Sequence, residues 1–66
     1  MNVTVNGKVE TVDEKMTISD FLAQKKLEPE KVVVEHNMDI IDRENLNTVI
    51  LKENDTLEIL RFVGGG

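Results

Sequence analysis

The chain has 66 residues, 39% of them hydrophobic, which leaves room for one small core and no second domain. The absence of cysteine excludes a disulfide, a cysteine-ligated metal centre and a thiol nucleophile. Thirteen acidic residues against eight basic ones give a net charge of -5, which would repel nucleic acid and anionic membranes. We therefore expect a soluble cytoplasmic domain without a signal peptide or membrane span. These features favour a protein that binds or is acted upon over an enzyme working alone.

The first segment predicts a β-hairpin. Residues 1–5 alternate between apolar and polar side chains, which is typical of a half-buried strand. Asn6-Gly7 follows, and both residue types accept the positive φ angles of a type I′ turn. The return strand, residues 8–12, is expected to be bulged or to lie at an edge, because Val9 and Val12 cannot share one face of a regular strand.

The apolar spacing then changes and predicts a helix over residues 17–25. Thr17 is expected to cap the first turn, and Asp20 suits the positive end of the helix dipole. Leu27 and Pro29 follow the expected helix end. The side chains predicted to face the core are Ile18, Phe21 and Leu22.

Extended segments dominate the rest of the chain. Residues 31–35 predict a β-branched strand, bounded by a turn in which His36 is expected to be solvated. A short strand at residues 40–41, a polar turn over 42–47 and a brief extended piece at 49–51 follow. A turn at Asn54-Asp55 precedes the final strand, residues 56–63. One helix on one face of a mixed sheet is an α+β architecture of two layers, with the strand after the helix expected beside the first strand.

The final strand has apolar side chains on both faces. If Leu57 and Ile59 enter the core, Leu60 and Phe62 point outward on the uncovered face of the sheet. On the pattern alone, a twisted strand that partly buries both pairs explains the sequence equally well. We predict the exposed arrangement, in which Leu60 and Phe62 form an apolar patch for a partner.

The last residues, Gly64, Gly65 and Gly66, carry no side chains and can enter a passage that excludes other residues. A terminal carboxylate is a poor electrophile, so it reacts only after activation, for example as a mixed anhydride with AMP. Glycines at a chain end are also typical of a frayed terminus or a linker, and this alternative stays open on the tail alone.

Three segments together resemble a known family. They are Met1–Val5 with Asn6-Gly7, the run Ile40-Ile41-Asp42-Arg43-Glu44, and the ending from Asp55 through Thr56–Val63 to Gly64-Gly65-Gly66. In these the whole chain resembles the ThiS family, the ubiquitin-like sulfur carriers of thiamine biosynthesis. The resemblance implies a single β-grasp domain over residues 1–63 and a flexible glycine tail over residues 64–66.

The resemblance also implies a reaction cycle without a catalytic side chain on this chain. An E1-like adenylating enzyme of the ThiF type would convert the Gly66 carboxylate to an acyl adenylate, and ATP and Mg would be bound by that enzyme. A sulfurtransferase persulfide would then leave a thiocarboxylate on Gly66. A thiazole synthase of the ThiG type would take the sulfur, while Gly64 and Gly65 thread the tail. No metal or cofactor is expected on the chain itself, which we expect to be monomeric when free.

A partner-binding surface is predicted around the last strand. Its apolar part consists of Leu60, Phe62 and Val63. Residues 35–58 hold seven acidic and two basic side chains, so we expect an acidic rim there that steers docking to a basic groove. The rim residues expected to contact the partner are Glu53, Asp55 and Glu58.

Other functions remain possible on the residues alone. Length and the approach Phe62-Val63-Gly64 favour a thiazole carrier over a carrier like the small subunit of molybdopterin synthase. A ubiquitin-like protein modifier would use the same adenylate. A non-covalent binding module would use the sheet face and leave the tail inert.

Overall fold

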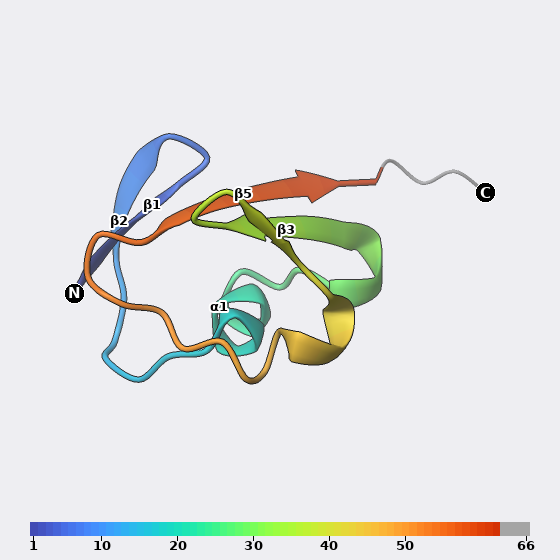
Figure 1. The fold of residues 1–66 in the computed structure, drawn as a ribbon, viewed down its shortest axis with the longest axis horizontal. Coiled ribbons are helices and arrows are strands. Elements are labelled where there is room, and N and C mark those ends of the chain that lie inside the picture. The colour runs from blue at the N-terminus through green and yellow to red at the C-terminus, as the bar shows by residue number, and fades with distance from the viewer. Residues whose placement is uncertain (63–66) are drawn as a thin grey trace.

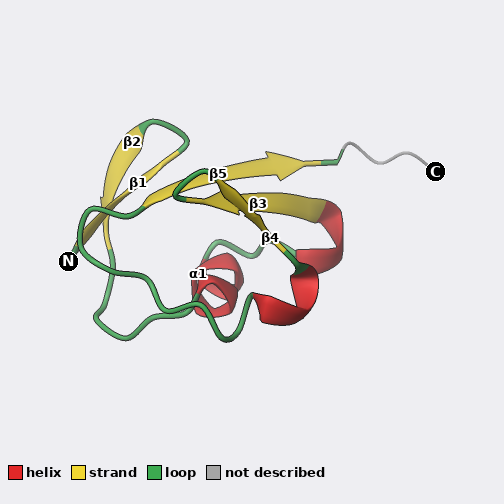
Figure 2. Ribbon diagram, viewed as in Figure 1, coloured by secondary structure: helices red, strands yellow, loops and turns green. Residues whose placement is uncertain are grey.

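The computed structural model describes residues 1–62, so Val63 and the glycine tail lie outside the described residues (Figure 1). In chain order the elements are β1 (Asn2–Val5), β2 (Lys8–Thr11), α1 (Ile18–Gln24), the short helix η1 (Pro29–Lys31), β3 (Val32–His36), β4 (Asp39–Ile41), the short helix η2 (Arg43–Asn45) and β5 (Thr56–Arg61) (Figure 2). No helix within residues 1–62 is long and apolar enough to cross a membrane.

The five strands form one mixed sheet in the order β2-β1-β5-β3-β4. β1 and β5 are parallel, whereas the other neighbouring pairs are antiparallel. The prediction that the strand after the helix lies beside the first strand is wrong, because β5 occupies that position. β5 carries Leu57 and Ile59 into the core, and its buried peptide groups need hydrogen-bond partners on both edges. Its central position supplies them, with β1 on one edge and β3 on the other.

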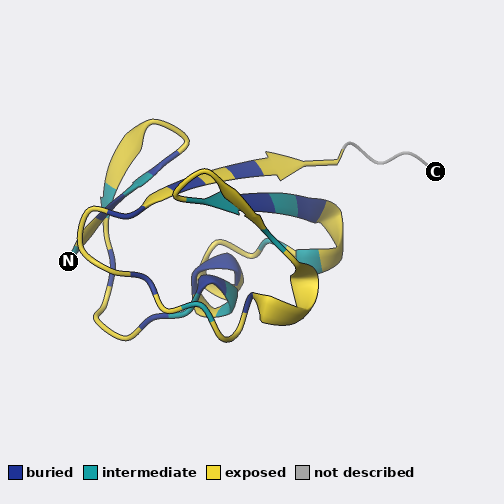
Figure 3. Cartoon of the chain, viewed as in Figure 1, coloured by how far each residue is buried: buried dark blue, intermediate teal, exposed yellow. Residues whose placement is uncertain are grey.

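The helix covers one face of the sheet, and the core lies between the two layers (Figure 3). Thr17 and Asp20 form a capping box, in which each side chain accepts a hydrogen bond from the other residue's backbone N–H. Ile18, Phe21 and Leu22 are buried, as the helical spacing predicts. The predicted α+β architecture, a β-grasp sheet with one main helix on one face, is confirmed.

The segment between β4 and β5 passes along the helix and closes the core. Leu46 and Leu51 are both buried. Leu46 lies within residues 42–47, which were predicted to form a polar turn. The backbone N–H of Ser19 donates to the Leu46 carbonyl at 2.8 Å, which satisfies a donor in the first turn of α1. The extended piece predicted at residues 49–51 consists of a single bridge between Ile50 and Thr17.

Candidate functional site: the open sheet face before the tail

β5 separates its apolar side chains between the two faces of the sheet. Leu57 and Ile59 are 0% and 7% exposed and pack toward the helix, whereas Leu60 and Phe62 are 63% and 55% exposed. The backbone N–H of Phe62 donates to the Lys31 carbonyl at 2.9 Å, so the pairing with the neighbouring segment continues one residue beyond β5. The predicted exposure of Leu60 and Phe62 is therefore confirmed.

Two apolar side chains of the neighbouring strands β3 and β4 share this uncovered face. Val33 in β3 stands directly opposite Leu60, and Ile40 in β4 is exposed one row further along the sheet. We call Val33, Ile40, Leu60 and Phe62 the open-face patch. Neither Val33 nor Ile40 was predicted from the sequence as part of the site. Val32 and Val34 are buried, so strand alternation alone assigns Val33 to the other face.

The acidic side chains beside this patch come from two strands. Glu58 in β5 is exposed and stands directly opposite Glu35 in β3. Like charges at opposed strand positions repel each other, so this row costs stability in the free protein. A cation on a partner would relieve that repulsion, which is consistent with the predicted docking to a basic groove.

Glu53 lies at the other end of β5. It precedes the strand, and its Oε1 accepts a hydrogen bond at 2.9 Å from the backbone N–H of Asn2 in β1. Phe62 follows the strand's last residue, so β5 runs between Glu53 and the apolar residues at its far end. Of the predicted acidic rim, Glu58 is therefore the member next to the patch.

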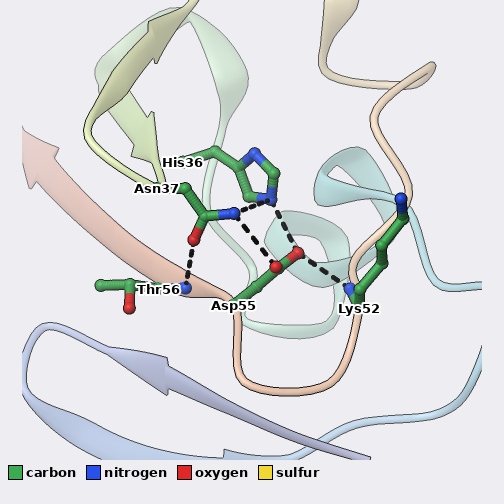
Figure 4. Close-up of polar contacts among 5 residues, drawn as sticks. All are labelled: His36, Asn37, Lys52, Asp55 and Thr56. Atoms are coloured by element: carbon green, nitrogen blue, oxygen red, sulfur yellow. Dashed lines mark hydrogen bonds and ion pairs between the residues drawn. The ribbon is translucent and has the colours of Figure 1, made fainter.

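Asp55 is not a surface residue, and its prediction as part of an exposed acidic rim is wrong. It is 7% exposed, and its carboxylate accepts hydrogen bonds from three groups (Figure 4). Oδ2 lies 2.7 Å from His36 Nε2 and 2.8 Å from the Lys52 backbone nitrogen, and Oδ1 lies 3.1 Å from Asn37 Nδ2. The carboxylate closes the turn before β5 and ties it to the end of β3.

His36 also differs from its predicted place in a solvated turn. It is the last residue of β3, opposite Leu57, and its side chain is 18% exposed. Strand alternation puts it on the same face as Val34, which brings its ring toward the helix side and within reach of Asp55. The contact spans 19 positions in the sequence, so no local pattern indicates it.

The surroundings of Asp55 set its pKa. Burial raises the pKa, because it removes water from the charged form, but the hydrogen bonds from His36, Asn37 and Lys52 lower it and prevail. Attraction to His36 acts in the same direction. The pKa of Asp55 is consequently lowered from its ordinary value of 3.8, and the group is a carboxylate at neutral pH.

The described residues bring together no cluster suited to metal binding, since no three histidine or acidic side chains in residues 1–62 converge on one point. Val63, Gly64, Gly65 and Gly66, which were predicted to contact and enter the partner, lie outside the described residues. The site therefore consists of an apolar patch with an acidic border that spans three strands, one of which, β5, precedes the glycines in the chain.

Comparisons with known proteins agree on one family. The family model described as the ThiS family matches residues 3–66. The sulfur carrier protein ThiS of Bacillus subtilis is 44% identical over 63 residues, covering 94% of this chain and 96% of that protein. The crystal structure of the thiamine biosynthesis protein ThiS from Geobacter metallireducens has a TM-score of 0.84 and 40% identity, with both chains fully covered.

A longer relative contains a similar segment. A thiazole synthase of Magnetococcus marinus is 33% identical over 66 residues, which is 100% of this chain but 20% of that protein. This chain thus spans about a fifth of the length of that relative.

Proposed function

Because the chain belongs to the ThiS family, we propose that it carries sulfur for the thiazole part of thiamine biosynthesis through the carboxylate of Gly66. In this proposal the chain is a protein co-substrate, and the enzymes that act on it supply the catalytic groups. The observation that carries the proposal is the position of two members of the open-face patch: Leu60 lies in β5, and Phe62 follows it directly, four residues before Gly66 in the chain.

The chemistry proceeds in three steps. A Gly66 carboxylate oxygen attacks the α-phosphorus of ATP, which the activating enzyme holds with Mg, and pyrophosphate leaves. The terminal sulfur of a sulfurtransferase persulfide attacks the carbonyl carbon of the adenylate, and AMP leaves. A thiol then cleaves the sulfur–sulfur bond of the acyl disulfide, which releases the thiocarboxylate and a new disulfide. The thiocarboxylate sulfur is the nucleophile that thiazole synthase consumes.

The residues suit this sequence of partners. Glycine has no Cβ, so Gly64 and Gly65 leave both sides of the chain open near the reacting carbon. The open-face patch offers Leu60 and Phe62 to each enzyme in turn, while Glu58 supplies charge for orientation. The thiazole synthase that contains a similar segment supports a partner of this class.

The proposal is tested at the terminus. Deletion of Gly66 withdraws the carboxyl carbon by about 3.5 Å, so we expect ATP–pyrophosphate exchange with the cognate adenylating enzyme to fall to background. One residue added after Gly66 should have the same effect, and Gly65→Val should impair exchange severely because its branched side chain blocks the passage. Mass spectrometry of the complete reaction should detect the thiocarboxylate on the unaltered chain alone.

Two controls separate activation from folding and docking. The tail variants should show the thermal unfolding of the parent. Phe62→Asp should also keep stability within about 0.5 kcal/mol, because surface substitutions rarely change it more, but should weaken enzyme binding. Normal exchange by the extended variant would contradict both the carrier and the modifier functions and leave the non-covalent binding module.

A further inference from the structure

The parallel pairing between β1 and β5 ends before β5 does. Its register consists of Thr4 with Thr56 and Val5 with Leu57, and the chain of β1 then turns at Asn6. β5 continues to Arg61 with β3 along its other edge. Figure 1 shows the β1–β2 hairpin turning away from β5 while β5 runs on toward the C-terminal end. One edge of β5 is therefore left without a neighbouring strand.

The side chain of Asn6 takes the place of a strand for one further residue. Its backbone N–H donates to the Leu57 carbonyl at 2.9 Å. Its Oδ1 accepts a hydrogen bond from the Ile59 N–H at 2.8 Å, and its Nδ2 donates to the Ile59 carbonyl at 3.2 Å. The amide thus pairs with both peptide groups of Ile59, as a peptide unit of an added strand would.

Arg61 is the next residue on the same edge. The N–H of Phe62 donates to Lys31 and the carbonyl of Thr56 accepts from Asn37, so the even-numbered residues of this strand direct their peptide groups toward β3. The peptide groups of Arg61 point the other way, like those of Ile59. Among the residues that the structure describes, none stands in register with Arg61 on that side.

A groove lies along this edge. It has a volume of about 220 Å³ and lies between the β1–β2 hairpin, the C-terminal end of α1 and the C-terminal half of β5. Its walls include Asn6, Arg61, Glu10 and Lys25, and Lys25 Nζ lies 2.6 Å from Glu10 Oε1. Within residues 1–62 no carboxylate forms an ion pair with Arg61, so the groove carries an excess positive charge beside the open edge.

We propose that an extended segment of the adenylating enzyme that receives the tail adds to the open edge of β5 at Arg61. An acidic side chain of that segment lies opposite the Arg61 guanidinium. This inference rests on the proposed function, since it concerns that enzyme. Added strands bind through main-chain hydrogen bonds, and the N–H and carbonyl of Arg61 offer such a pair directly before the tail. The charge of the groove selects an acidic side chain over a basic one.

The same charge argues against a second copy of this chain as the occupant. An antiparallel pair of copies centred on this position would place Arg61 opposite Arg61, and like charges at opposed positions destabilise a strand pair. A basic side chain on an edge is also a common protection against self-association. The occupant is therefore a different chain.

Arg61→Pro and Arg61→Ala form a matched pair of variants. Both remove the guanidinium, but only proline removes the N–H. Leu60 is already extended, as a residue before proline must be, and the hydrogen bonds to β3 come from Leu60 and Phe62, so the sheet should persist. We expect Arg61→Ala to weaken binding to the cognate adenylating enzyme a few-fold and Arg61→Pro to weaken it at least tenfold, measured by calorimetry without ATP.

Amide hydrogen exchange provides a second measurement on the unaltered chain. In the free chain the Arg61 amide should exchange much faster than those of Ile59, Leu60 and Phe62, and the enzyme should slow it at least tenfold. Equal binding by the two variants, or an Arg61 amide that the enzyme leaves unprotected, would overturn the inference. Protection of that amide in a concentration-dependent dimer, without enzyme, would assign the edge to a second copy and overturn it as well.

Failure of this inference and failure of the proposed function give different results. Failure of the inference leaves adenylation of the unaltered chain intact. Conversely, a chain that binds the enzyme through a protected Arg61 amide but yields no adenylate would support the edge contact and contradict the sulfur-carrier function.

Discussion

The carboxylate of Asp55 connects three segments of the chain through hydrogen bonds. One carboxylate receives hydrogen bonds from the end of β3, from the turn after it and from the chain entering β5. Asn37 completes the arrangement, since its Oδ1 accepts the Thr56 N–H at 2.9 Å. Burial of a charge is costly unless such partners are present, so the cluster acts as one unit whose stability depends on the charge of Asp55.

The lowered pKa of Asp55 predicts a loss of stability in acid. A carboxyl whose folded-state pKa lies below its unfolded value stabilises the fold fully above the unfolded value, here near 3.8, and loses that contribution as the pH falls through the folded value. Asp55→Asn should lower the free energy of unfolding by about 1.5–3 kcal/mol at pH 7, the range for a hydrogen bond to a charged group. The variant should lose less further stability than the parent between pH 5 and pH 2.

Urea denaturation across that pH range checks the prediction. Asp13→Asn is the matched control, because Asp13 is exposed and the exchange of side chains is the same. The control should follow the parent at every pH. Parallel acid profiles for the parent and Asp55→Asn would show that Asp55 titrates alike in the folded and unfolded chain.

The two hairpins of the sheet use the same turn with different residues. Asn6 and Gly7 connect β1 and β2 with φ angles of 49° and 84°, and Asn37 and Met38 connect β3 and β4 with φ angles of 50° and 77°. Glycine adopts the second angle without strain, whereas a methionine there brings its Cβ close to the backbone. Met38 is also 90% exposed, so packing does not compensate for the strain.

Substitutions at the two turns should therefore have opposite signs. Met38→Gly should raise the free energy of unfolding by roughly 0.5–1 kcal/mol, because relief of left-handed strain exceeds the entropy cost of glycine. Gly7→Ala should lower it by a similar amount, and strain alone would be the cause, since an added Cβ meets no atom within 4 Å. Thermal unfolding of both variants measures the effect, and destabilisation by Met38→Gly would refute the common turn geometry.

At the scale of the whole molecule, the two faces of the sheet differ: one faces the core and the other is open to a partner. The helix and the segment that follows β4 cover one side and bury the core. The other side stays uncovered and holds the open-face patch beside the opposed pair Glu35 and Glu58. Because these two acidic residues repel each other, their pairing lowers the free energy of unfolding of the free chain. This pair lies where the proposed partner would dock.

Glu58→Lys should therefore stabilise the free chain while slowing its activation. In this variant the attraction between the substituted lysine and Glu35 replaces the repulsion between Glu58 and Glu35. We expect the free energy of unfolding to rise by roughly 0.2–1 kcal/mol. The rate of association with the adenylating enzyme should fall, most at low salt, because exposed charges are screened within about 10 Å at 0.1 M. Stopped-flow association rates and urea denaturation provide the two measurements.

Glu53→Lys is the control for position, since Glu53 lies at the opposite end of β5. It changes the net charge by the same amount, so a difference between the two association rates reports a local effect beside the patch. Equal slowing by both would mean that overall charge, not Glu58, governs the encounter.

The features that depend on neighbours in the chain were predictable from the sequence. The first hairpin, the capped helix and the two faces of β5 follow from turn chemistry, helical spacing and strand alternation, which are local properties. Strand alternation was consistent with the exposed pair Leu60 and Phe62 that we predicted, and the family resemblance rested on the first hairpin, residues 40–44 and the ending from Asp55 to Gly66. Local patterns therefore identified the strand at the centre of the site.

Only the tertiary structure decided which distant segments meet. The central position of β5, the burial of Asp55 against His36 and the pairing of Asn6 with Ile59 join residues 19 to 53 positions apart. Val33 and Ile40 likewise joined the patch through strand register. Such contacts form because buried peptide groups and charges must find partners in the complete fold, and the identity of each partner is set by topology rather than by adjacent residues.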